Sequence, residues 1–149
     1  MPVPPSCTPA RRPPVPDIEP GLDLGELRVP ITRSDVVRYS GAATDFNEIH
    51  FSDRHARAIG LPGVLAHGMW TMGAGLRLVT DWIKDPARVR RYQVRFTRPV
   101  IVPDTDEGTE VVYTGQVTAV ADGIATVTLT ATCGEDTVLG AARVEVSVD

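Results

Sequence analysis

PGVLAHGMWTMGAGLRLVTDWI, residues 62–83, is the longest continuous apolar segment of the chain and the stretch that decides its fold. Apolar side chains recur in it at helical spacing, at Leu65, Met69, Met72, Leu76, Val79 and Ile83. The stripe is broad, which predicts a helix that is buried on most of its sides. Gly68, Gly73 and Gly75 lower helix propensity and make sense where a sheet or a second helix packs very close.

After this segment the period of the apolar residues changes from helical to about 2. Apolar and polar side chains alternate in four runs, residues 92–97, 111–119, 125–131 and 138–148. Each run is typical of a strand with one buried face. Turn residues at Asp122-Gly123 and at residues 134–136 join the last three runs, which predicts consecutive hairpins and an antiparallel sheet.

One long helix and one half-buried sheet predict an α+β fold in which the sheet curls around the helix, the hot-dog arrangement. A single sheet wrapped on one helix leaves an open edge, so we also expect the chain to form dimers.

The N-terminal region predicts a tail followed by small elements. Residues 1–20 contain eight prolines and predict an extended tail ahead of one domain, residues 21–149. Residues 26–32 are typical of a short edge strand. A short helix is expected next, with Thr32 or Ser34 as its N-cap and Gly41 at its end. One or two further helical turns then end at Gly60.

Composition excludes several classes of protein. The 149 residues suit one domain, and a net charge of -4 argues against general nucleic-acid binding. Cys7 and Cys133 fit neither a disulfide framework nor a metal-ligand spacing, which favours a reducing, cytoplasmic setting. We expect no secretion signal and no membrane span, because no window holds about 18 apolar residues.

SGAATDFNEIHFSDRHA, residues 40–56, places an acid, an amide and an imidazole within six positions, at Asp45, Asn47 and His50. An imidazole gives or takes a proton near neutral pH, and a nearby carboxylate or amide can fix a water molecule. In the alternative interpretation, Asp45 forms an Asx turn and Asn47 binds loop backbone. The chemistry of these residues alone leaves both interpretations open.

His67 and Gly68 stand at the expected start of the long helix. Helix N-termini offer free N–H groups, and a glycine there lets a carbonyl oxygen approach, so the Gly68 N–H is a candidate oxyanion donor. The simpler interpretation, which spacing alone favours, is that Gly68 serves packing and His67 serves capping.

These residues together resemble the MaoC-like hydratases and dehydratases, the (R)-specific enoyl-thioester hydratases, and among them the catalytic B-type subunits of mycobacterial (3R)-hydroxyacyl-ACP dehydratases. The family signature is matched at Tyr39, Asp45, Asn47, Ile49, His50, Ala56 and His67-Gly68-Met69. The likeness runs from about residue 21 to the C-terminus. It implies the hot-dog fold and the reversible hydration of trans-2-enoyl thioesters.

The resemblance also implies roles for individual residues. Asp45 and His50 would hold the reacting water, Asn47 would position them, and the Gly68 N–H would stabilise the thioester oxygen. Substrate contacts are expected at His67, Met69, Arg95 and Arg98. No metal and no organic cofactor are expected, and the substrate would be an acyl-CoA or acyl-ACP thioester. The chain would form a homodimer, or a heterodimer with a second hot-dog subunit.

Several positions depart from the family pattern or leave alternatives open. Thr44 stands where the family usually has glycine, and a threonine disfavours a positive φ. Glu48 stands where the family usually has proline. The arginines of residues 88–98 can dock an acidic carrier or simply form a solvated strand face. A hot-dog thioesterase would need a carboxylate or nucleophile on the helix, which offers only Asp81. A non-catalytic partner subunit would lack the Asp45 and His50 pair.

Overall fold

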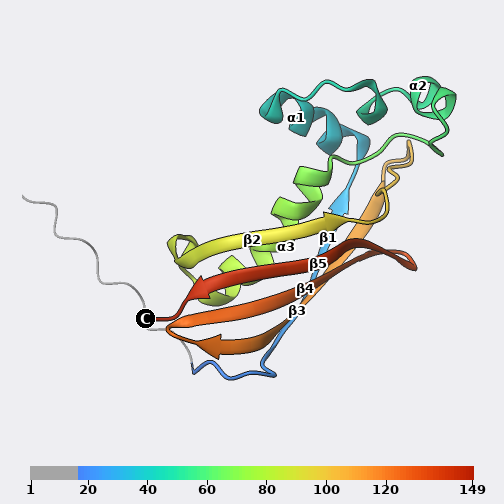
Figure 1. Ribbon diagram of the computed structural model, residues 1–149. Coiled ribbons are helices and arrows are strands. Elements are labelled where there is room, and N and C mark those ends of the chain that lie inside the picture. Colours follow the sequence, from blue (N-terminus) through green and yellow to red (C-terminus); the bar gives the residue numbers. More distant parts are fainter. Residues whose placement is uncertain (1–16) are drawn as a thin grey trace, which may run out of the picture.

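The computed structural model describes residues 17–149, in which one antiparallel sheet curls around one long helix (Figure 1). The strands are β1 (Asp23–Ile31), β2 (Val89–Phe96), β3 (Thr109–Ala121), β4 (Ile124–Cys133) and β5 (Asp136–Ser147). They lie in the order β1-β3-β4-β5-β2, so β1 and β2 are the edges. The predicted α+β hot-dog fold is confirmed. Most of the proposed tail lies outside the described residues.

Both predicted hairpins are present. Asp122 and Gly123 form the two-residue loop between β3 and β4, with φ of 50° and 70°. Gly134 and Glu135 join β4 to β5, and Gly134 also has a positive φ of 59°. Positive φ at these positions suits the hairpin turns that match the twist of the strands, which is why the sequence signal was specific.

The long helix α3 (Gly68–Ile83) begins later than the apolar segment does. The preceding residues are extended, and Leu65 pairs with Ile101 in an isolated bridge. The prediction of burial on most sides is wrong for the outer face of α3, where Met69 is 60% exposed. The sheet covers only the opposite face, which buries Thr71, Gly75, Leu78, Val79 and Ile83.

The close packing expected at the helix glycines occurs at Gly75. A Cβ atom there would lie 2.8 Å from the ring of Tyr113, which is fully buried on β3. The absence of a side chain at Gly75 therefore lets α3 pack closely against β3 of the sheet. Around Gly73, by contrast, a Cβ atom would meet nothing within 4 Å.

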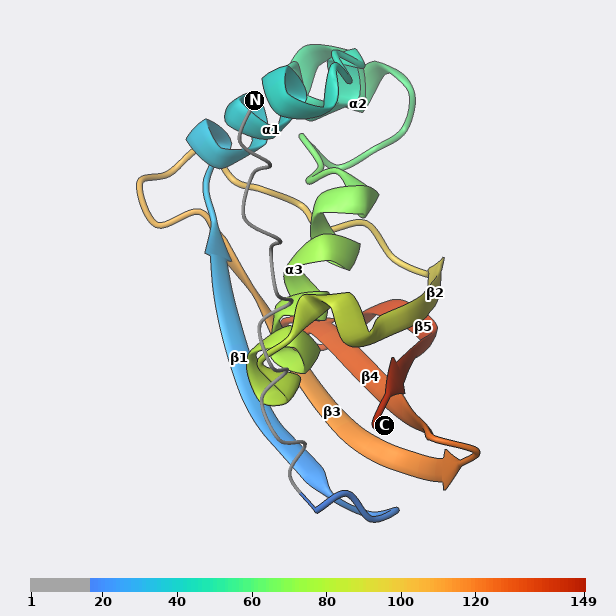
Figure 2. The ribbon, with the colours of Figure 1, turned by 90° about the vertical axis from the view of Figure 1, so that its left-hand side faces the viewer.

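The smaller helices gather at one end of α3, beyond the sheet (Figure 2). They are α1 (Arg33–Ala43), η1 (Glu48–His50) and α2 (Asp53–Ala58), while η2 (Pro86–Arg88) lies between α3 and β2. Thr32 caps α1 through a capping box with Asp35, as the sequence indicates. None of the helices in residues 17–149 is long and apolar enough to span a membrane.

Two expectations about the end of α1 are wrong. The helix continues past Gly41 to Ala43, and Thr44 is its C-cap in the left-handed region, with φ of 54°. The Thr44 N–H donates to the Ser40 carbonyl, and its hydroxyl donates to the Ala43 carbonyl. These bonds offset the steric cost of a left-handed threonine, so Thr44 occupies the conformation that glycine usually supplies.

Candidate active site

His50 is a nearly buried imidazole at the end of η1. Asn47 caps this turn by accepting a hydrogen bond from the Ile49 N–H at 3.3 Å, and His50 is only 8% exposed. The Nδ1 atom of His50 lies 2.9 Å from the Leu65 carbonyl oxygen. Since a carbonyl only accepts, Nδ1 carries the proton, and Nε2 of the neutral ring has a free lone pair.

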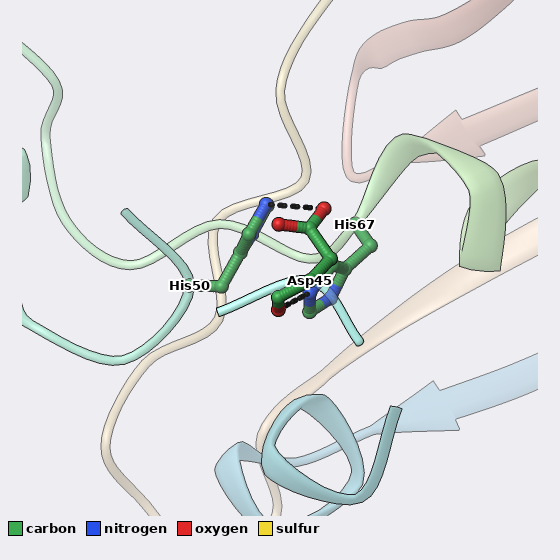
Figure 3. Close-up of side chains that lie close together, drawn as sticks. All are labelled: Asp45, His50 and His67. Carbon is green, nitrogen blue, oxygen red and sulfur yellow. Dashed lines mark hydrogen bonds and ion pairs between the residues drawn. The ribbon is translucent and has the colours of Figure 1, made fainter. Parts of the chain in front are cut away.

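Asp45 faces that lone pair from the loop after α1. Its Oδ2 atom lies 3.9 Å from His50 Nε2 (Figure 3). This separation exceeds a hydrogen bond, so it leaves a water molecule within reach of both groups. The Oδ1 atom accepts the Asn47 N–H at 3.2 Å in an Asx turn. The sequence left two interpretations of Asp45 open, an Asx turn and a partner of His50. In the structure Asp45 forms the Asx turn and also faces His50.

His67 lies behind this pair and supports it. Its ring stacks on His50 with centroids 3.7 Å apart and planes 19° apart. Its Nε2 atom lies 3.3 Å from both the Ser40 hydroxyl oxygen and the Asp45 carbonyl oxygen, so Nε2 carries the proton. Burial, with a smaller effect from His50, lowers the pKa of His67. A neutral His67 thus ties α1, the Asp45 loop and the His50 ring together.

A pocket of about 310 Å³ opens beside His50. Gly68 also lines it, and as the first residue of α3 its N–H has no acceptor within the helix. The remaining walls are mostly apolar and come from segments far apart in the sequence: Ile49; Leu65, Ala66 and Thr71; Phe96 to Val100; and Val138 and Leu139. An imidazole lone pair and a free helix N–H therefore border one apolar pocket.

The other residues expected to contact substrate lie in different places. Arg98 lines the pocket and is exposed, whereas Arg95 is exposed on β2 and is not among the residues of the pocket wall. Met69 lines a separate recess on the outer face of α3, and His67 is buried behind His50. Glu48 lies near His55, with 3.5 Å between Oε2 and Nδ1.

Two residues that line the pocket, Phe96 and Thr71, were not among the candidates that the sequence offered. Phe96 packs so close to the helix start that a Cβ atom at Gly68 would lie 3.1 Å from its ring. Its place two residues before Arg98 was the available signal. Thr71 also lines the pocket, and its hydroxyl donates to the His67 carbonyl; a threonine one turn into the predicted helix after Gly68 was the available signal.

Asp45, His50 and His67 also offer three potential ligand atoms within 4.8 Å of one another. Their geometry does not fit a metal centre. The two imidazole rings are nearly parallel, so their in-plane lone pairs cannot converge on one ion. The proton on His67 Nε2 is also held by the Ser40 and Asp45 oxygens.

Residues 19–135 match the family described as MaoC like domain. The chain belongs to this family. A relative from Mycobacterium tuberculosis, 3-oxo-4,17-pregnadiene-20-carboxyl-CoA hydratase beta subunit, is 31% identical over 72% of this chain and 79% of its own length. A solved structure named MaoC-like dehydratase is 34% identical, with a TM-score of 0.88, over 94% of this chain and 44% of that chain.

Another relative from Mycobacterium tuberculosis, 3-hydroxyacyl-thioester dehydratase X, is 36% identical over 62% of this chain. The match covers 32% of that protein, so this chain spans about a third of its length. These relatives are named for hydration or dehydration, the two directions of one hydro-lyase reaction.

Proposed function

We propose that this chain catalyses the reversible hydration of trans-2-enoyl thioesters to (3R)-hydroxyacyl thioesters. One observation carries the proposal: His50, which faces Asp45, lines an apolar pocket together with Gly68, the first residue of α3. An apolar pocket suits an acyl chain, and its few polar groups fix the orientation of the reacting atoms. The names of the relatives support the same reaction.

In the hydration direction, the water oxygen bonds to C3 of the enoyl group and one water proton moves to C2. Asp45 and His50 hold the water, and together they accept that proton and return it at C2. His50 suits this work because its Nε2 lone pair is free while Nδ1–H is bound to Leu65. Dehydration reverses the same steps.

Negative charge develops on the thioester oxygen as water adds, and the Gly68 N–H stabilises it. The N-terminus of α3 adds the positive end of the helix dipole at this point. Asn47 positions the catalytic pair by capping η1, which carries His50. Neither the stabilisation of the oxygen by the start of α3 nor the positioning by Asn47 requires a metal or an organic cofactor.

The carrier of the acyl chain is CoA or an acyl carrier protein, both of which are negatively charged. Arg98 at the pocket meets the carrier side of the substrate, and Arg95 extends this positive charge along β2. His67 and Met69 were also expected to bind substrate. We assign His67 to the support of the catalytic pair and Met69 to the outer face of α3.

A second candidate function is that of a subunit active only with a partner. Its basis is the outer face of α3, where Met69 and Gly73 are exposed, together with the open edge at β2. A hot-dog partner, identical or different, suits this face. The related 3-oxo-4,17-pregnadiene-20-carboxyl-CoA hydratase chain is itself named a beta subunit.

The test follows the enoyl absorbance of crotonyl-CoA and of a longer trans-2-enoyl-CoA with the purified protein. We expect Asp45→Asn and His50→Ala each to lower kcat/KM by at least about 100-fold, the usual scale for a lost acid or base. His55→Ala is the matched control, because His55 is a half-buried histidine of the neighbouring α2 outside the pocket wall and should leave the rate unchanged. Chiral analysis of the product should find the (3R) alcohol.

Full activity in the Asp45 and His50 variants would refute the site. A folded wild-type protein without activity on either substrate would favour the partner-dependent candidate, which is then tested by adding a copurified second subunit.

A further inference from the structure

We propose that Thr71 positions the oxyanion donor by locking the peptide between His67 and Gly68. This inference rests on the proposed function, because the direction of the Gly68 N–H matters only if a thioester oxygen binds there. Thr71 is thus a positioning residue, whereas Asp45 and His50 are the proposed catalytic pair.

One peptide group joins the oxyanion donor to the carbonyl that Thr71 binds. The His67 carbonyl and the Gly68 N–H belong to the same trans peptide, so they point in opposite directions. The carbonyl accepts two hydrogen bonds from Thr71, from its N–H at 3.1 Å and from its hydroxyl at 3.3 Å. Fixing the carbonyl toward the helix therefore fixes the N–H away from it, at the residue that lines the pocket.

This end of α3 needs such a restraint. His67 is the N-cap of the helix but makes no side-chain capping bond. The first helical residue is glycine, which has the greatest backbone freedom of any residue. The Thr71 hydroxyl restrains this first turn in another way, by adding a second hydrogen bond to the His67 carbonyl.

Thr71 is itself held in place. It is 3% exposed, and the hydroxyl of the fully buried Tyr113 donates to its carbonyl oxygen at 2.9 Å. The chain of contacts thus runs from the sheet through Tyr113 and Thr71 to the peptide before Gly68. Hydrogen bonds in such a chain polarise one another, so a carbonyl with two donors makes its own peptide N–H a stronger donor.

The test compares three variants on the enoyl thioester that the wild-type protein hydrates. Thr71→Val removes the hydroxyl and keeps the shape of the side chain, whereas Thr71→Ser keeps the hydroxyl. Thr80→Val is the matched control, because the Thr80 hydroxyl also donates to a backbone carbonyl of α3, that of Arg77 at 3.3 Å, away from the pocket.

We expect Thr71→Val to lower kcat about tenfold and to change KM less than about twofold, since the donor acts mainly in the transition state. Thr71→Ser and Thr80→Val should stay within about twofold of the wild type in both constants. Circular dichroism melts of all three variants check that the protein is folded.

A second measurement reports on the donor without turnover. Butyryl-CoA has no double bond to hydrate, and its thioester carbonyl stretch should shift to lower frequency when it binds to the wild-type protein. The shift should be smaller in Thr71→Val and restored in Thr71→Ser.

Wild-type values of both kcat and the carbonyl band in Thr71→Val would overturn the inference. Equal losses in the Val and Ser variants would also overturn it, because they would point to packing of the methyl group. A wild-type protein that hydrates no enoyl thioester would instead overturn the proposed function, and this inference with it.

Discussion

The sheet and the overhang, residues 32–67, are stabilised by different interactions. The inward side chains of the central strands, such as Val111, Val127 and Val144, are fully buried against α3. The overhang instead depends on caps and polar bonds, and its Phe46 is 65% exposed. The proposed catalytic groups Asp45 and His50 come from the overhang, whereas much of the pocket wall comes from β2, the loop after it and β5. The site therefore forms only where the two regions meet, because His50 and Leu65 of the overhang line one pocket with Phe96 of β2 and with β5.

The largest expected effect is a disruption of the packing between α3 and the sheet. Gly75→Ala places a Cβ atom 2.8 Å from the ring of Tyr113, a fully buried side chain. We expect a loss of about 1–3 kcal/mol in the free energy of unfolding, the usual cost of an overpacked core. Urea denaturation measures this change.

Gly73→Ala is the matched control on the same helix. A Cβ atom there meets nothing within 4 Å, so the substitution should stabilise the protein by about 0.5–1 kcal/mol through helix propensity alone. Equal effects of the two alanines would show that Gly75 is not a packing glycine and that α3 does not rest on Tyr113 as described.

A smaller effect is expected from Asp53, which joins parts of the overhang. Its carboxylate accepts from Arg33 of α1 at 2.8 Å and from the Val64 N–H at 3.0 Å. The Arg33 bond first, and the Val64 bond second, lower the pKa of Asp53. Asp53→Asn should cost about 1 kcal/mol at neutral pH and speed amide exchange in the overhang more than in the sheet.

The sign of the pH dependence follows from the lowered pKa of Asp53. The stabilisation is complete above the ordinary carboxyl pKa of about 4 and is lost as the pH falls through the lower pKa of the folded state. The Asn variant should therefore differ from the wild type at pH 7 and converge with it in strong acid. Asp106→Asn, on an exposed loop, serves as the control. Uniform acceleration of exchange across sheet and overhang would contradict a local role.

The same contrast explains what the sequence could predict. Strand alternation and hairpin turns are local signals, and they located β2 to β5 and both turns. The Asp45, Asn47 and His50 motif was also local. The stacking of His67 on His50 and its bonds to Ser40 and to the Asp45 carbonyl depend on residues that only the fold brings near. The left-handed Thr44 is held by local bonds to Ser40 and Ala43, but a threonine in place of glycine predicts the opposite conformation. The sequence predicts burial for the outer face of α3 because an apolar stripe does not indicate which part of the protein covers it.

The smallest expected effect is the titration of His67, which joins the overhang to α3. Burial lowers its pKa, so the folded protein holds the neutral ring while the unfolded chain binds a proton near pH 6.5. Below that pH the unfolded state binds more protons, and the free energy of unfolding should fall by at most about 1.4 kcal/mol per pH unit from this group. Melting temperatures from pH 8 to pH 5 should decline in the wild type and decline less in His67→Gln, which keeps an N–H donor but does not titrate. Identical declines in both proteins would show that a neutral His67 does not hold the two regions together.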